Sequence, residues 1–157
     1  MKKSSGGPKK FVAGVFMFLA VAALAACQSG PPKISIQGAS AQLSPAIYGE
    51  AMVTMTINNQ GGADVLDGVT VDIPGASAML HVMKGKVMQE ASSVKIPGGK
   101  PTVFKMGSSH IMIKGMPRSM AAGSTFTMTL QFEKSGVKKL RLTLQKAPQA
   151  PMAMPMN

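Results

Sequence analysis

The 157-residue chain is poor in cysteine and in aromatic side chains. It has one cysteine, one tyrosine and no tryptophan, and aromatic residues make up only 4% of it. A single cysteine cannot form an internal disulfide, so the fold must be stabilised by core packing. Nucleic-acid binding usually needs basic stripes combined with stacking rings. We therefore expect no nucleic-acid partner, although the formal net charge is +11.

The first 26 residues contain no acidic side chain and have the features of a leader. Four lysines precede an uninterrupted apolar run at residues 11–26. This run is short for a membrane span, and its flanks are those of a secretory signal peptide. We therefore predict that residues 1–26 are a signal peptide and that the protein is exported.

The only cysteine follows this leader directly, in the sequence Leu24-Ala25-Ala26-Cys27. These residues resemble the lipobox of bacterial lipoproteins, in which a peptidase cuts before the cysteine and the new N-terminal cysteine carries the lipid. The resemblance implies lipidation of Cys27, a tether over residues 27–33, and a protein anchored on the periplasmic side of the cell envelope. It leaves open which membrane holds the anchor. An ordinary signal peptide that keeps one cysteine is the alternative.

Short segments in which every second residue is apolar follow between residues 34 and 146. Residues 51–57, 124–132 and 139–144 alternate apolar side chains with threonine or charged side chains, as half-buried strands do. Turns rich in glycine, proline and asparagine separate such segments, and no segment has a convincing helical period. The pattern predicts one all-β domain over residues 34–146, built as an antiparallel sandwich or barrel.

Methionine is abundant, with fifteen residues, whereas histidine occurs only twice. Each histidine stands two residues before a methionine, in His81-Val82-Met83 and in His110-Ile111-Met112. In a strand, residues i and i+2 point to the same face. Each pair therefore presents an imidazole and a thioether side by side.

A tight turn follows the first of these pairs. Gly85-Lys86 has the composition of a two-residue type II′ hairpin turn. Such a turn would place Met83 opposite Met88 and His81 opposite Glu90, all on one face of the hairpin. A slip of the register by one residue would change this arrangement.

Neutral imidazole and soft thioether donors suit Cu(I). Calcium and magnesium prefer several carboxylates, and only Glu90 is near. Zinc would accept the two histidines and Glu90 but gains little from methionine. A blue-copper site needs a cysteine thiolate, and Cys27 is committed to the lipid. A chance occurrence of the His-x-Met spacing in a chain rich in methionine is the alternative.

From Ile57 to Leu144 the chain resembles the periplasmic copper chaperone family called PCuAC. The signature of that family is a histidine, a methionine, twenty-one further residues, and then His-x-Met. Twenty-one residues separate Met88 from His110, and Met112 completes His-x-Met. The segments 58–69 and 96–99 resemble the Asn/Gly turn, the Ala-Asp pair, the Leu-x-Gly and the Pro-Gly-Gly that frame the ligands in the family.

The resemblance implies a Greek-key β-sandwich, cupredoxin-like or immunoglobulin-like, with an exposed Cu(I) site. The implied ligands are His81, Met88, His110 and Met112. The family usually has ten residues between its first histidine and the methionine, whereas His81 and Met88 are separated by six. Met83, or Met79 on the same strand face, is therefore a possible substitute ligand.

The resemblance also implies a chaperone that delivers copper to the CuA centre of cytochrome oxidase or to another exported carrier. Ser109 beside His110 lacks a G-x-S-x-G elbow and an acid to orient the histidine, so we expect no enzymatic activity. A structural or adhesion lipoprotein that binds no metal is the alternative function, because β-sandwiches host many functions.

The last segment, residues 147–157, is rich in proline and methionine and lacks the alternation of a strand. We predict that it is a disordered tail. Met152, Met154 and Met156 alternate with alanine and proline where no core can use them. We interpret them as an accessory arm that collects copper, with a functionally neutral tail as the alternative.

Overall fold

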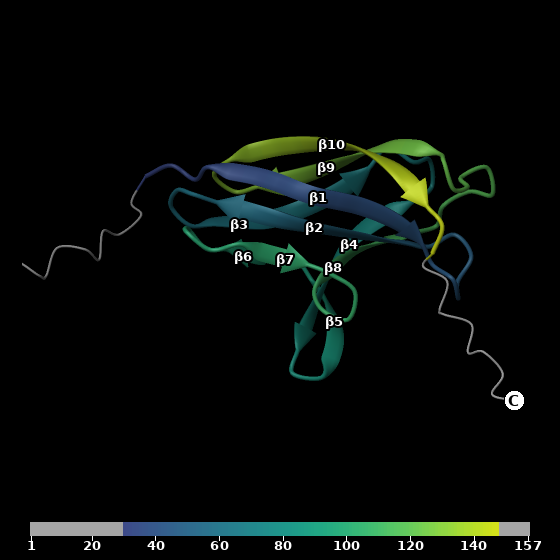
Figure 1. Ribbon diagram of the computed structural model, residues 1–157, viewed down its shortest axis with the longest axis horizontal. Coiled ribbons are helices and arrows are strands. Elements are labelled where there is room, and N and C mark those ends of the chain that lie inside the picture. Colours follow the sequence, from purple (N-terminus) through teal and green to yellow (C-terminus); the bar gives the residue numbers. More distant parts are fainter. Residues whose placement is uncertain (1–29, 148–157) are drawn as a thin grey trace, which may run out of the picture.

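The computed structural model describes residues 30–147 of the chain, and this part contains ten β-strands (Figure 1). They are β1 (Ile34–Leu43), β2 (Ala51–Asn59), β3 (Asp64–Val71), β4 (Ser77–Lys84), β5 (Val87–Ala91), β6 (Val94–Ile96), β7 (Thr102–Phe104), β8 (His110–Lys114), β9 (Thr125–Phe132) and β10 (Gly136–Gln145). The all-β prediction is thereby confirmed. Within this part of the chain no helix is long and apolar enough to cross a membrane.

The strands form two layers that are joined along one edge. Their order is β5-β4-β8-β2-β1-β10-β9-β3-β6, and β7 pairs with β2 beside β8. The antiparallel prediction holds for every pair but one, because β1 and β10 run parallel, with Ala41 opposite Leu144. This pairing follows a register shift in β1 near Gly38, whose φ of 61° is a left-handed conformation. Beyond the shift, β1 lies against β10 of the second layer.

The core lies between the two layers and is built by alternating strand residues. On β2, Ala51, Val53, Met55 and Ile57 are at most 3% exposed, and the residues between them point outward. Burying a side chain of this size contributes about 1.5–3 kcal/mol. The largest buried side chains come from both layers and include Phe104, Ile111, Phe132, Leu66 and Leu130. The outward-facing residues of β2 and its neighbours are therefore not part of this core.

The Asn/Gly turn and the Pro-Gly-Gly turn fit against each other at one end of the sandwich. The side-chain oxygen of Asn59 accepts the backbone N–H groups of Lys33 and Gly61 at 3.1 and 3.0 Å. A Cβ added to Gly98 would lie 2.2 Å from the carbonyl oxygen of Gly61, so only glycine fits there. The Asn/Gly turn and the Pro-Gly-Gly turn therefore have a structural role, which explains these residues without a ligand-binding role.

Candidate metal centre

The candidate ligands lie on the outer face of strands β4, β5 and β8. On these strands Leu80, Ile111 and Ile113 point into the core and are at most 2% exposed. Since neighbouring residues of a strand point to opposite faces, His110 and Met112 of β8 share the outer face. The same alternation places Met79, His81 and Met83 of β4 there.

The register between β4 and β8 brings four of these side chains into a square. His81 lies opposite His110, and Met79 lies opposite Met112. Residues directly opposite in an antiparallel pair have Cβ atoms about 4.5–5.5 Å apart. The two imidazole rings have centroids 5.3 Å apart and an interplanar angle of 69°. Two imidazoles and two thioethers are thus presented together by neighbouring strands.

The hairpin of β4 and β5 has the predicted register. Met83 lies opposite Met88, and His81 lies opposite Glu90. The turn contains the two residues Gly85 and Lys86, and Gly85 has a φ of 65°, as a two-residue hairpin turn requires. In Figure 1 this hairpin projects from the body of the sandwich.

Met88 and Met79 differ in their relation to β8. Met88 is on β5, so β4 stands between it and His110 and Met112. Met79 is directly across from Met112 on the neighbouring strand. Met83 is the more solvent-exposed residue of the hairpin pair, at 37%. The structure therefore groups His81, His110 and Met112 most closely with Met79, and it places Met83 and Met88 one step further along the hairpin.

His110 is held with one ring nitrogen available for a ligand. The residue is only 5% exposed, which differs from the exposed site that the family resemblance implies. Its Nδ1 lies 2.9 Å from the carbonyl oxygen of Ser108, and a carbonyl can only accept, so Nδ1 carries the proton. Nε2 is buried and has no hydrogen-bond partner among the described residues. A buried polar atom without a partner costs free energy, and a metal ion at Nε2 would remove that cost.

The carbonyl that orients His110 belongs to the loop between β7 and β8. The N–H of Lys105 donates to the carbonyl of Ser109 at 2.8 Å, and the N–H of Ser108 donates to the carbonyl of Lys105 at 3.1 Å. These two bonds close the loop and fix the position of the Ser108 carbonyl. Sequence reasoning missed this role of Ser108, because a backbone acceptor leaves no mark on residue type.

The environment of His81 favours its neutral form. Partial burial lowers the pKa of His81 below the ordinary 6.5, and the neighbouring His110 and Lys114 act in the same direction. Glu90 and Glu50 oppose this shift without outweighing it. Imidazole binds a metal ion through an unprotonated nitrogen. The pKa of His81 therefore leaves it able to bind at neutral pH.

The donor set is neutral and soft. Within residues 30–147 no three His, Cys, Asp or Glu side chains come together as a metal-binding group. The donors that do meet on this face are imidazole nitrogens and thioether sulfurs. Thioethers prefer soft monovalent copper to hard divalent ions. The residues present therefore fit Cu(I).

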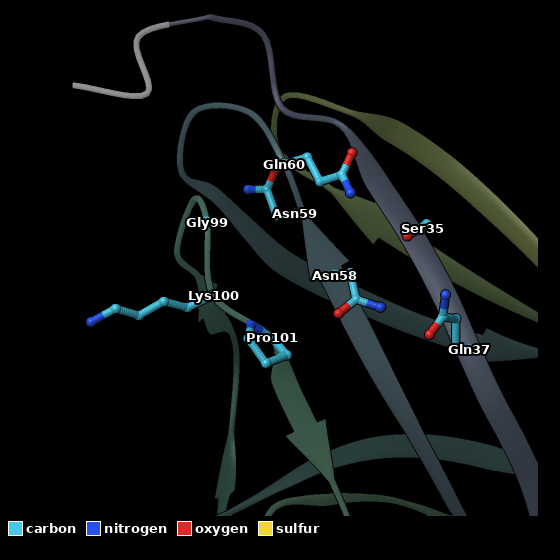
Figure 2. A pocket seen from close by; sticks show the side chains of 8 residues that line it. All are labelled: Ser35, Gln37, Asn58, Asn59, Gln60, Gly99, Lys100 and Pro101. Carbon is cyan, nitrogen blue, oxygen red and sulfur yellow. The ribbon is translucent and has the colours of Figure 1, made fainter. Parts of the chain in front are cut away.

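A hollow that contains none of the candidate ligands lies at the other end of strands β1 and β2. Its volume is about 360 Å³, and its lining is polar: Ser35, Gln37, Asn58, Asn59, Gln60, Gly99, Lys100 and Pro101 (Figure 2). It contains neither histidine nor methionine. The side-chain nitrogen of Asn59 is already engaged by the carbonyl oxygen of Gly62 at 2.7 Å. This hollow is separate from the metal centre.

Several predicted site residues lie outside the described part of the chain. They are Cys27, with the signal peptide and the first three residues of the tether, and the tail residues Met152, Met154 and Met156. Sequence reasoning also missed Met52, which lies directly opposite Met112 on β2. The available indication was its position, since the outward residues that follow it on β2 are Thr54, Thr56 and Asn58.

A family model described as "Putative lipoprotein LpqE-like" matches residues 34–145. These residues run from the start of β1 to the end of β10. No curated protein sequence matches the chain significantly.

Solved structures of PCuAC domains resemble the chain in fold. The apo PCuAC domain from PmoF1 has a TM-score of 0.64 and 22% identity, covering 75% of this chain and 98% of that domain. The copper-bound PCuAC domain from PmoF2 has a TM-score of 0.61 and 21% identity, with coverages of 75% and 97%. The solution structure of CuI-DR1885 from Deinococcus radiodurans has a TM-score of 0.63 and 21% identity, with coverages of 80% and 88%. The PCuAC-type fold predicted from the sequence is thereby confirmed.

Proposed function

The chain belongs to the LpqE-like family, and we propose that it is a chaperone of the cell envelope that binds Cu(I) and passes it on. The observation that carries this proposal is the buried Nε2 of His110, which has no partner among the described residues and belongs to a square of two histidines and two methionines. Two of the solved structures with this fold are copper-bound or CuI forms, which supports copper as the ligand.

The position of the site suits transfer rather than storage. Three of its four ligands, Met79, His81 and Met112, are partly exposed, and only His110 is buried. Met83 of the adjoining hairpin is 37% exposed. An incoming ligand from another protein can therefore approach the ion and replace the chaperone's ligands one at a time. We propose that the recipient is the CuA centre of cytochrome oxidase or another exported copper carrier.

A Cu(I) titration of the mature protein tests this function. We expect one ion to be taken from a chromogenic competitor, with both nitrogen and sulfur ligands visible by X-ray absorption. Met79→Leu should weaken binding more than Met88→Leu, because Met79 lies directly opposite Met112. Met83→Leu should have the smallest effect of the three.

Met55→Leu is the matched control for these variants. Met55 is on β2 but faces the core and is 3% exposed, and a volume-conserving exchange there costs less than about 1.5 kcal/mol. It should bind Cu(I) like the wild type. If the wild type takes no Cu(I) from even a weak competitor, the function is refuted. A larger loss for Met88→Leu than for Met79→Leu would instead reassign the fourth ligand.

We propose that Cys27 carries the lipid anchor, on the basis of Leu24-Ala25-Ala26-Cys27 after the basic and apolar leader. Cys27→Ser should release the protein from membranes or leave the leader uncleaved, because the thiol that accepts the lipid is gone. Fractionation of cells expressing each form measures this. Equal recovery of both forms in the soluble periplasm would contradict the lipid anchor.

We propose that the methionines of the tail collect copper for the site. β10 ends at Gln145, which lies opposite Gln42, and Gln42 lies opposite Met52. Gln145 is thus three strand spacings from Met112, or about 14 Å. Met152 is seven residues further on, and seven extended residues span about 23 Å, so its thioether can reach the site.

Deleting residues 148–157 should leave folding intact and slow the capture of Cu(I) from weak donors. The sulfur-specific control is full-length protein in which Met152, Met154 and Met156 are all replaced by leucine, which should be equally slow. Stopped-flow measurement of copper capture gives the rates. Unchanged rates in both variants would reject the arm.

A further inference from the structure

Three methionines form a row across the outer face of three neighbouring strands. Met79 of β4 lies opposite Met112 of β8, and Met112 lies opposite Met52 of β2. Opposite residues share one face, so all three thioethers stand on the same side as the two histidines. The row ends at Gln42 of β1, which lies opposite Met52.

These methionines are not needed for the core. The residues adjacent to Met52 and Met112 supply the core instead, since Ala51, Val53 and Ile111 are fully buried. The outer face of a sandwich is ordinarily polar, and β2 follows this rule at Thr54 and Thr56. Met52 departs from it at the position directly opposite Met112, and it is only partly buried.

The spacing lets the three sulfurs meet. Neighbouring strands are about 4.8 Å apart, so Met52 and Met79 flank Met112 at roughly equal distances on either side. Methionine has three rotatable side-chain bonds, which allow the flanking thioethers to lean toward the central one. Three thioethers around one point make a soft, uncharged donor set that is suited to a monovalent soft ion.

We propose that Met52, Met112 and Met79 form an all-thioether position for Cu(I) or Ag(I), adjacent to the histidine-containing position and able to hold an ion without the histidines. The inference rests on the proposed function, because the two positions share Met112 and Met79. It adds Met52 as a ligand and provides a second binding position for the ion on the sheet face, on the side toward β1. An ion that moves there exchanges imidazole for thioether.

Ag(I) titration followed by NMR of the methionine methyl groups, labelled with carbon-13, tests this position in the wild-type protein. Because one ion is shared between the two positions, Ag(I) should shift the methyl signals of Met112 and Met52 together during the titration. The signal of Met55, on the opposite face of the same strand, should not move. If Met112 shifts while Met52 stays unchanged through three equivalents, the all-thioether position is refuted and the proposed function stands. If Met112 itself does not shift, the proposed function fails.

A pair of variants isolates the contribution of sulfur. In protein carrying His81→Leu and His110→Leu, residual Ag(I) binding should remain, and adding Met52→Leu should raise its dissociation constant at least tenfold. Leucine keeps the apolar surface and removes only the thioether. Equal binding with and without Met52→Leu would show that the row is merely an apolar patch, and would overturn the proposal. Met55→Leu in the same background should leave the dissociation constant unchanged.

Discussion

Replacing His110 and Met112 together by leucine is expected to abolish tight Cu(I) binding while the domain stays folded. These two residues supply the imidazole and the thioether of β8, and within residues 30–147 only His110 has a buried side-chain nitrogen without a partner. Loss of a residue that only hydrogen-bonds to a metal ligand already weakens metal binding about 10–100-fold. Loss of two ligands should therefore weaken it by more than about 100-fold.

The stability of the metal-free protein distinguishes a lost site from a lost fold. His110 is 5% exposed, and leucine would remove an unsatisfied buried nitrogen, a group that costs about 1–3 kcal/mol. The loss of the bond to Ser108 offsets part of this gain. Thermal unfolding of the double variant should therefore stay close to that of the wild type. Native-like affinity for Cu(I) in a folded double variant would contradict the assignment of the metal centre.

Replacing Asp64 by alanine is expected to destabilise the fold strongly. Asp64 is 2% exposed and holds the turn between β9 and β10 against the start of β3. Its carboxylate accepts the N–H of Val65 at 2.8 Å, the N–H of Lys134 at 2.9 Å, and both the N–H and the hydroxyl of Ser135. Each donor left unsatisfied costs about 1–3 kcal/mol, so the free energy of unfolding should fall by about 3 kcal/mol or more.

The pH dependence of unfolding gives an independent check of Asp64. Burial alone would raise the pKa of Asp64, but the hydrogen bonds from Ser135, Lys134 and Val65 outweigh it and lower the pKa below 3.8. A carboxyl with a depressed pKa contributes stability that is present above about pH 4 and is lost as pH falls through the folded-state pKa. The wild type should lose this share of stability in acid. Asp64→Ala should lack this contribution to the free energy of unfolding at every pH.

Asp67→Ala is the matched control, because Asp67 is an exposed acid on the same strand. Its replacement should change the free energy of unfolding by less than about 0.5 kcal/mol. Chemical denaturation at neutral and at acid pH measures both variants. Equal stability of Asp64→Ala and Asp67→Ala would contradict the structural role of Asp64.

The sequence by itself determined the features that depend on local geometry. Alternation along residues 51–57 predicted β2, because a strand with one buried face must repeat every two residues. The two-residue turn at Gly85 and Lys86 predicted the pairing of Met83 with Met88, since a tight turn fixes the register of its own hairpin. The His-x-Met spacings placed an imidazole and a thioether on one face for the same reason.

Only the tertiary structure decided the relations between strands that are distant in the chain. The pairing of His81 with His110 joins residues twenty-nine positions apart, and its register follows from how the core side chains of β4 and β8 pack. This register selects Met79 as the neighbour of Met112 and brings in Met52 from β2. The parallel pairing of β1 with β10 likewise joins opposite ends of the domain. No local pattern encodes such registers, because a strand presents the same alternation to any partner, and only packing of the complete core distinguishes one register from the next.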